Sequence, residues 1–314
     1  MTGGTGFIGS NLVKALDAEG HELRLLSRKP IADYENFICN FEEDVIPEDA
    51  FKNIDVVYHL AGIAHDTRDA LKIEFLYRKI NVDTSIQLVK LAAKNGVRKF
   101  IFVSSVKAGG APPNGKCYNE NSGVGPEDIY GLTKKEAEQS ILEIGKSAGM
   151  HVSIIRPSLV YGPNVKGNLE LLLDGIHKGW FPPLPKINNF RTMIHIDDLI
   201  NAILLVTDHV DANDEIYIVT DGVQYSSRAI YEAICLATGR SIPGWNVPIV
   251  FFKLFAKLGD FFGRFVRFPF NSYGYGKLFG DDCYVSDKIR SQLGYNSKMT
   301  LVDALPEMIS VVEK

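Results

Sequence analysis

The 314-residue sequence lacks the patterns that would assign it to several common classes. It has no CxxC pair and no Cys/His set at metal-ligand spacing, so we predict no metal site. Its four cysteines lie far apart, and we interpret them as reduced structural thiols of a reducing compartment: Cys39, Cys117, Cys235 and Cys283. No run of ~18 uncharged apolar residues predicts a transmembrane helix. No basic-then-apolar leader is present either, and we therefore expect a cytoplasmic protein.

The sequence also lacks an excess of positive charge. Lys and Arg number 34 against 38 Asp and Glu, which gives a net charge of −4. Such a balance provides no general attraction for a phosphate backbone, so we expect no nucleic-acid partner. The hydrophobic fraction of 46% and the length suit one large or two fused globular domains.

Three glycines at a spacing of three residues open the chain: Gly3, Gly6 and Gly9. A helical pattern follows over 11–16. Without a Cβ, a residue allows a tight strand-to-helix turn and lets a pyrophosphate approach the backbone at the helix N-terminus. A tight turn without a ligand is the alternative. The short strand predicted over 20–26, at the expected distance, favours dinucleotide binding.

A central strand should precede such a turn, yet only Met1 and Thr2 stand before Gly3. Either the chain lacks this strand, or its true start lies a few codons upstream. We favour the second hypothesis, because loss of a buried central strand would cost several kcal/mol, comparable to the stability of a domain.

Apolar runs alternate with helical patterns along the first half of the chain. We predict strands at 54–60, 99–104 and 152–157 and helices at 71–94 and 127–146. This alternation predicts a doubly wound α/β fold with a parallel sheet and a smaller, mixed C-terminal part. Prolines and glycines disrupt 161–190. The expected domains are a Rossmann domain, 1–160 with about 191–222, and a substrate domain, about 161–190 with 223–314.

Eight of the 18 phenylalanines lie between 251 and 270, interrupted by five charged residues: Lys253, Lys257, Asp260, Arg264 and Arg267. An amphipathic helix pair that covers a substrate pocket is the favoured interpretation. A helix that lies on a membrane surface is the alternative, because cations alternate with bulky apolar groups.

The reactive residues are expected after the fourth strand. Ser104-Ser105 ends this strand, where doubly wound sheets bind ligands. Tyr130 and Lys134 stand four residues apart on a predicted helix and so share one face. We expect the Lys134 ammonium to lower the pKa of the Tyr130 phenol toward neutrality and make it a general base, with Ser105 hydrogen-bonded to the same oxygen.

Together these segments resemble the extended short-chain dehydrogenase/reductases, in particular the NAD-dependent epimerase/dehydratase branch that acts on nucleotide sugars. The resemblance spans nearly the whole chain and rests on six segments: Thr2–Gly9, His59–Gly62, Val103–Ser105, Tyr130–Lys134, Arg156–Pro163 and Ile194–Leu199.

The resemblance implies a catalytic set of Ser105, Tyr130 and Lys134. The following residues are expected to bind the dinucleotide, with Ser27, Arg28, Lys29 and Asn40 assigned by their positions in the family pattern: Gly3, Gly6, Phe7, Ile8, Gly9, Ser27, Arg28, Lys29, Asn40, Leu60, Ala61, Gly62, Asn81, Tyr130, Lys134 and Pro157. For the sugar nucleotide the resemblance implies Ser105, Asn164, Asn168 and Arg191, and it implies a homodimer through the helix that bears Tyr130.

Departures from the family pattern bear on which cofactor and which reaction we expect. Ser27, followed by Arg28 and Lys29, stands where NAD-binding members usually place an acid. NAD and NADP both stay open, with NADP slightly favoured. Asn40 stands where an aspartate often meets the adenine. The Asp-Glu pair of 4,6-dehydratases is replaced by Val106-Lys107, which disfavours dehydration.

The resulting hypothesis is NAD(P)-dependent hydride transfer at C4 of a nucleotide-linked hexose or hexosamine, by a UDP-sugar 4-epimerase or a 4-keto reductase of surface-polysaccharide synthesis. A non-catalytic dinucleotide sensor on the same fold and an NADPH reductase of a non-sugar carbonyl are the alternatives. The intact Ser105, Tyr130 and Lys134 argue against the sensor.

Overall fold

The computed structural model describes residues 1–64, 70–111, 115–122, 125–263 and 270–312. Eight strands lie within this part of the chain: β1 (Arg24–Ser27), β2 (Glu35–Ile38), β3 (Val56–His59), β4 (Lys99–Val103), β5 (His151–Pro157), β6 (Leu159–Tyr161), β7 (Met193–His195) and β8 (Glu215–Val219). The α-helices of the same part are α1 (Phe7–Ala18), α2 (Ala70–Tyr77), α3 (Thr84–Lys94), α4 (Ile129–Ala148), α5 (Asn168–Lys178), α6 (Ile196–Asp208), α7 (Ser227–Ala237), α8 (Ile249–Phe262), α9 (Ser272–Phe279), α10 (Asp287–Leu293) and α11 (Leu301–Val312). Short 3-10 turns are η1 (Glu48–Phe51), η3 (Val106–Gly109) and η4 (Val210–Ala212), and a π-helical segment is η2 (Arg78–Asp83).

The main sheet is parallel throughout. Strand β1 pairs with β2, and β3, β4, β5 and β8 follow one another in that order. A separate small sheet joins β6 to β7. The predicted strands at 20–26, 54–60, 99–104 and 152–157 correspond to β1, β3, β4 and β5, so the expected doubly wound α/β fold is confirmed.

Met1 and Thr2 take the place of the expected central strand. Leu26 of β1 donates a backbone hydrogen bond to Met1, and Thr2 donates to Tyr58 of β3. Thr2 thereby bridges β1 and β3 in parallel fashion and joins the two parts of the main sheet. The Met1 amino group donates to the Arg24 carbonyl at 2.6 Å.

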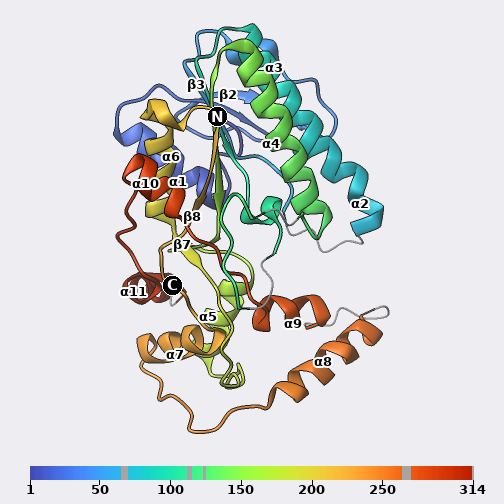
Figure 1. Cartoon of the computed structure of the whole chain (residues 1–314), viewed down its shortest axis with the longest axis vertical. Coiled ribbons are helices and arrows are strands. Elements are labelled where there is room, and N and C mark those ends of the chain that lie inside the picture. Colours follow the sequence, from blue (N-terminus) through green and yellow to red (C-terminus); the bar gives the residue numbers. More distant parts are fainter. Residues whose placement is uncertain (65–69, 112–114, 123–124, 264–269, 313–314) are drawn as a thin grey trace.

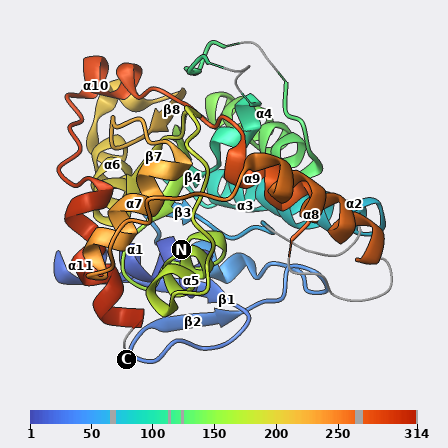
Figure 2. The same cartoon turned by 90° about the horizontal axis from the view of Figure 1, so that it is seen from below.

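Helices cover both faces of this sheet, α1 and α6 on one face and α3 and α4 on the other (Figures 1 and 2). The first face has its own apolar core, to which α1 contributes Leu12 and Leu16 and α6 contributes Ile203. The core of the second face includes Leu88 of α3 and Ile141 of α4. Burial on both sides explains why the strand sequences are apolar runs without alternation.

A third apolar core lies beyond the carboxyl ends of the strands. It joins α5, α7 and α11 through residues such as Leu173, Ile234 and Leu305, all nearly inaccessible to solvent. Figure 1 shows these helices, with α8 and α9, below the sheet. No helix of the described residues is long and apolar enough to cross a membrane.

The helix predicted over 71–94 is interrupted. Helix α2 ends at Tyr77, the π-helical turn η2 spans Arg78–Asp83, and α3 begins at Thr84. A π-turn inserts one extra residue in a helix and is frequent at functional sites. Here it presents the buried Asn81 to the loop that follows β3.

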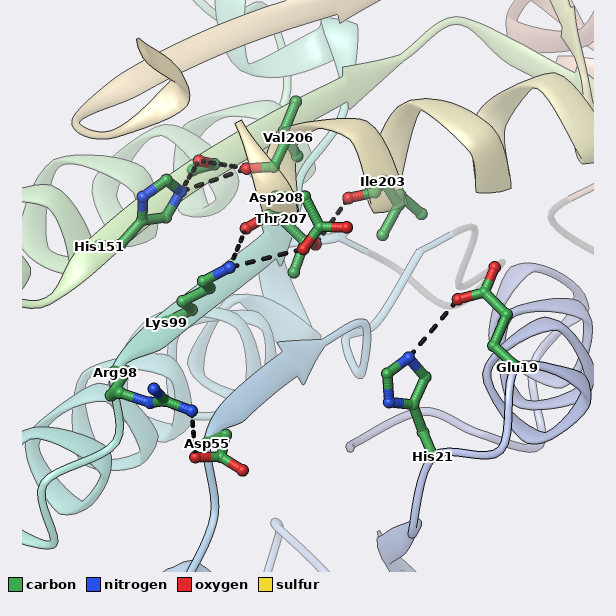
Figure 3. A network of polar contacts seen from close by, with 11 residues as sticks. Glu19, His21, Asp55, Arg98, Lys99, His151, Ile203, Val206, Thr207 and Asp208 are labelled. Carbon is green, nitrogen blue, oxygen red and sulfur yellow. Dashed lines mark hydrogen bonds and ion pairs between the residues drawn. The ribbon is translucent and has the colours of Figure 1, made fainter. Parts of the chain in front are cut away.

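Polar contacts tie the amino ends of the strands to the C-terminus of α6 (Figure 3). Lys99, the first residue of β4, donates to the Thr207 carbonyl at 2.7 Å. A hydrogen bond of 3.2 Å between His151 Nε2 and the Val206 carbonyl links the first residue of β5 to the same helix. A lysine near the last carbonyls of a helix satisfies them and complements the helix dipole. These contacts fix the sheet at the edge opposite to the candidate site.

A disulfide corrects our interpretation of the cysteines. Cys117 and Cys283 are bonded to each other, whereas Cys39 and Cys235 are free and buried. The backbone of Tyr118 pairs with residues 283 and 285 beside this bond. The interpretation as reduced thiols was wrong for the pair because their separation of 166 residues gave no sign of spatial contact.

Helix α4 is fixed to β5 by a buried ion pair. Arg156 donates from Nε and Nη2 to the two carboxylate oxygens of Glu138, at 2.9 Å and 2.5 Å. The side chains of Arg156 and Glu138 are only 7% and 1% exposed. Removal of one partner of such a pair leaves the other charge buried without compensation.

We therefore expect Glu138→Ala to lower the free energy of unfolding by about 3–5 kcal/mol, measured by urea denaturation. Glu48→Ala is the matched control, because Glu48 forms an ion pair with Lys94 at 2.8 Å on the surface. Its urea midpoint should stay close to that of the wild type. Equal shifts in both variants would contradict the assignment of the buried pair as a structural link.

Candidate active site

The glycine turn lies at the carboxyl edge of the sheet and leads into α1. Gly3 has a φ of +74°, and a Cβ placed on it would lie 2.7 Å from the Ala61 nitrogen. A Cβ on Gly9 would lie 2.0 Å from the Gly3 carbonyl oxygen. Gly6 is the N-cap residue of α1, and no side chain caps this helix. This crowded backbone at an uncapped helix N-terminus fits a dinucleotide pyrophosphate. Phe7 and Ile8 follow, both half-buried.

The residues expected near the adenosine ribose follow β1 and β2. Ser27 ends β1, and its hydroxyl donates to the Lys29 carbonyl at 2.6 Å. Arg28 and Lys29 are exposed. Asn40 follows β2, and its side-chain oxygen accepts from the Glu42 nitrogen at 3.3 Å. Arg28 and Lys29 thus follow directly after the last residue of β1, and their contact with the dinucleotide stays a prediction.

The Leu60-Ala61-Gly62 segment follows β3 and contacts Asn81. Asn81 Oδ1 accepts from the Ile63 nitrogen at 2.8 Å, and its Nδ2 donates to the Ile63 carbonyl at 3.2 Å. A Cβ on Gly62 would lie 3.0 Å from Asn81 Oδ1 and 3.3 Å from Lys134 Nζ. The π-turn therefore holds the loop after β3 beside the predicted catalytic lysine.

A chain of buried hydrogen bonds links the central strand to this loop. Thr2 Oγ1 lies 2.7 Å from His59 Nδ1, and His59 Nε2 lies 2.7 Å from Ser85 Oγ. Ser85 donates its proton to the Asn81 carbonyl. Its oxygen must then accept from His59, so His59 carries its proton on Nε2 and accepts from Thr2 on Nδ1.

The same chain reaches α4. Asn81 Nδ2 donates to Thr133 Oγ1 at 3.1 Å, and Thr133 precedes Lys134. Burial and the nearby Lys134 ammonium both lower the pKa of His59 well below its usual range. A neutral imidazole is what the assigned tautomer requires. The hydrogen-bond chain Thr2–His59–Ser85–Asn81–Thr133 is therefore a fixed element of the site.

Ser105 and Tyr130 meet beyond the end of β4. Ser105 follows Ser104 after the last residue of the strand and begins η3, where its oxygen accepts from the Lys107 nitrogen at 3.3 Å. Tyr130 stands in the first turn of α4, whose N-cap Asp128 accepts from the Gly131 nitrogen at 2.7 Å. The Ser105 hydroxyl forms a hydrogen bond with the Tyr130 phenol. The predicted Ser–Tyr pair is therefore present.

The expected acidification of Tyr130 is not present. Burial raises the pKa of its phenol to about 12, and the hydrogen bond from Ser105 opposes this rise. The charges that act on the phenol are nearby acids such as Asp128 rather than the Lys134 ammonium. Our prediction of a lowered pKa was wrong because it counted the neighbouring charge and not the loss of hydration.

Lys134 lies under the end of β4. Its Nζ donates to the Val103 carbonyl at 3.1 Å and lies 4.6 Å from the centre of the Phe102 ring. Burial lowers the pKa of its ammonium to about 8, while the carboxylate of Glu138, one helical turn later, raises it. The ammonium thus occupies the space between the end of β4 and Gly62.

The expected substrate residues are spread along the chain after β5. Pro157, which was expected at the dinucleotide and not at the substrate, ends β5 and is buried. Asn164, with a φ of +65°, and Asn168, the first residue of α5, are exposed in and after the turn that follows β6. The Arg191 side chain donates to the Lys277 carbonyl of α9, and Asp282 and Asp281 lie near it. Arg191 is thus held by internal contacts.

Sequence reasoning missed Ser85 and Thr133 as members of the hydrogen-bond chain, and it named His59 only as part of the His59–Gly62 segment expected beside the cofactor. Their only signal was polarity at positions that the strand and helix patterns bury. It also missed Glu138, which lies one turn beyond Lys134 on the same face of α4. Among the described residues, no group of three or more His, Cys, Asp or Glu side chains could hold a metal ion.

Comparisons with known proteins assign the family. The model of the NAD dependent epimerase/dehydratase family matches residues 1–220. The UDP-glucose 4-epimerase of Vibrio cholerae is 34% identical over 268 residues, which cover 82% of this chain and 81% of that protein. The N-acetyl-alpha-D-glucosaminyl-diphospho-ditrans,octacis-undecaprenol 4-epimerase of Escherichia coli O157:H7 is 25% identical over 79% of this chain and 74% of its own.

Among solved structures, MoeE5 in complex with UDP-glucose and NAD has a TM-score of 0.78 at 21% identity. The match covers 99% of this chain and 97% of MoeE5. This likeness supports the Rossmann-type fold. With the match over 1–220, it follows that the chain belongs to the NAD dependent epimerase/dehydratase family, and its cofactor is NAD or NADP.

The low pKa of Lys134 has a consequence for stability. Between pH ~8 and ~10.5 the unfolded chain binds the Lys134 proton and the folded protein does not, so stability rises with pH in this window. We expect the stability of the wild type relative to Lys134→Met to increase by up to about 3 kcal/mol from pH 8 to pH 10.5. Urea denaturation across this range measures it. A pH-independent difference would contradict the burial of a charged Lys134.

Proposed function

We propose that the protein is a nucleotide-sugar 4-epimerase that inverts the configuration at C4 of a UDP-linked hexose or hexosamine. The single observation that carries this proposal is the meeting of Ser105 and Tyr130 at the carboxyl edge of a sheet with a glycine turn that fits a dinucleotide. The 34% identity to a UDP-glucose 4-epimerase over 82% of the chain supports the choice of reaction.

The proposed roles follow from the contacts. The bound dinucleotide supplies the hydride acceptor and donor. Tyr130 removes the proton of the C4 hydroxyl in one direction and returns it to the C4 carbonyl oxygen in the other. In the protein without a dinucleotide its pKa is raised to about 12, so Tyr130 holds its proton at neutral pH, the form that the second direction needs. The first direction needs the ionised phenol, and the positive charge of a bound, oxidised nicotinamide would favour that form. Ser105 shares the phenolic oxygen and fixes its position.

Lys134 and the hydrogen-bond chain orient the cofactor end of the site in this proposal. We assign the binding of the ribose next to nicotinamide to the Lys134 ammonium, which lies between Val103 and Gly62. Arg28 and Lys29 at the end of β1 favour NADP slightly over NAD, and a 4-keto reductase that exchanges NADP is the second candidate. Lys107 pairs with Asp282 at 2.9 Å where a dehydratase would place an acid.

The substrate is proposed to bind between the main sheet and the third apolar core, beside Asn164, Asn168 and Arg191. This placement rests on the expected division into a Rossmann domain and a substrate domain. A homodimer through α4, a cytoplasmic location and a role in surface-polysaccharide synthesis also stay predictions.

The test uses the purified full chain with UDP-glucose or UDP-N-acetylglucosamine and no added cofactor, with products separated by anion-exchange chromatography. We expect conversion to the C4 epimer, because an epimerase regenerates its own bound cofactor. Consumption of NADPH with a 4-keto-6-deoxy sugar, and no conversion without added cofactor, would instead identify a reductase. No turnover in either assay would contradict both candidates.

Replacement of Tyr130 by Phe tests the assigned proton carrier. We expect Tyr130→Phe to lower kcat by ~10²–10⁴, the usual loss of a general acid–base, while dinucleotide binding persists. Tyr273→Phe is the matched control, because Tyr273 is an exposed tyrosine of α9. Its kcat should equal that of the wild type. Unchanged turnover in Tyr130→Phe would remove this residue from the mechanism.

A further inference from the structure

Helix α8 carries an apolar face that is exposed in the described part of the chain. Its opposite side is held in place, since the Phe252 ring contacts the Phe279 ring with centroids 5.0 Å apart, and Ala256 is buried. The exposed apolar face consists of Val250, Phe251, Leu254, Leu258, Phe261 and Phe262. Val250, Phe251 and Phe261 are 70%, 62% and 61% exposed.

These six residues form one continuous stripe. At 100° per residue they fall within an arc of about 120° on α8, next to the arc of Phe252 and Ala256 that packs on the protein. A helix that serves only to cover a pocket would turn this stripe inward. Large exposed apolar patches rimmed by polar residues mark interaction sites with proteins or membranes.

Charge borders the stripe on its free side. Lys253 and Lys257 are exposed and lie on the arc next to Val250. Asp260, the acid of α8, is engaged by Ser272, whose nitrogen donates to it at 3.0 Å. Between 249 and 268 the sequence has four basic residues and one acidic residue. On the described helix the border thus has two cations, Lys253 and Lys257, and one acid that Ser272 already engages, which suits an anionic surface.

The pattern fits a lipid surface better than a protein partner. A standard protein interface uses about 20–30 residues on each side, far more than this stripe supplies. An interfacial helix needs an apolar face with Phe and Leu, a polar face with Lys, and an anionic bilayer. The segment before α8 adds Trp245, which is 62% exposed, and Trp is enriched at membrane interfaces.

The position of α8 in the fold agrees with such a contact. In Figure 1, α8 and the segment that leads into it from α7 lie at the end of the molecule farthest from the amino edge of the sheet. Figure 2, viewed from this end, shows α8 in the foreground on the side of α2 and α3. Helix α4, through which the dimer is predicted, lies higher on the same side, so a dimer through it leaves the lower end accessible.

We propose that the α8 stripe docks the protein on the surface of an anionic membrane, with α8 parallel to the bilayer. At ~1.5 Å per residue its 14 residues span only ~21 Å, so the helix lies on the bilayer and does not cross it. This docking does not depend on which sugar the site accepts.

The experiment is flotation of the full chain with vesicles of phosphatidylcholine that contain about one third phosphatidylglycerol, compared with vesicles of phosphatidylcholine alone. We expect the wild type to float with the anionic vesicles, to bind the neutral vesicles more weakly, and to be released as salt rises. A wild type that stays in the soluble fraction with both vesicles would overturn the proposal.

The variant Phe251→Glu/Leu254→Glu should reduce vesicle binding at least about tenfold, because two apolar anchors are lost. Phe75→Glu is the matched control, since Phe75 is 76% exposed on α2 and lies outside the stripe. It should bind like the wild type. Equal binding of both variants would overturn the proposal. So would conversion of a dimer to a monomer by the α8 variant without an effect on lipid, because the stripe would then join two copies.

Lys253→Gln/Lys257→Gln provides a second test that leaves the apolar stripe intact. Each lysine near an anionic surface contributes roughly fivefold to binding, so we expect a clear loss with anionic vesicles and no change with neutral ones. Circular dichroism confirms the fold of each variant. If the stripe variant fails to fold, unchanged binding of the lysine variant to anionic vesicles still overturns the proposal.

Discussion

The buried hydrogen-bond chain Thr2–His59–Ser85–Asn81–Thr133 connects the parts of this structure that must keep their places. It begins at the residue that joins the two parts of the sheet, passes through a neutral histidine at the end of β3 and ends on α4 beside Lys134. Buried polar groups that are all satisfied specify one arrangement of the core. The glycine turn and the reactive helix therefore hold one fixed geometry.

The electrostatics of the site follow from the same burial. Tyr130 and Lys134 are both pushed toward their neutral forms, since the pKa of the phenol is raised to about 12 and that of the ammonium is lowered to about 8. The two groups were expected to stabilise each other's charge. Instead, Lys134 is satisfied by the Val103 carbonyl and Tyr130 by Ser105. In this protein, desolvation of the two side chains affects their pKa values more than the attraction between their charges does.

Much of the fold could be predicted from local patterns. The strands that became β3, β4 and β5 are continuous apolar runs, and the glycine turn and the YxxxK helix contain their own signals. The π-turn at Asn81, the Met1–Thr2 bridge and the disulfide could not be predicted, because each depends on a partner distant in sequence. Likewise, the Phe-rich segment did not reveal which of its residues face outward, since both interpretations share one periodicity.

The disulfide between Cys117 and Cys283 has a practical meaning for any study of this protein. It encloses 166 residues of chain, including α4 and β5, and such a closure restricts the unfolded state by about 5 kcal/mol in the chain-entropy view. A thiol reductant in a storage buffer would therefore remove a constraint on the segment that leads into the reactive helix. Samples handled with and without reductant would be two different materials, and their thermal midpoints and turnover numbers should not be pooled.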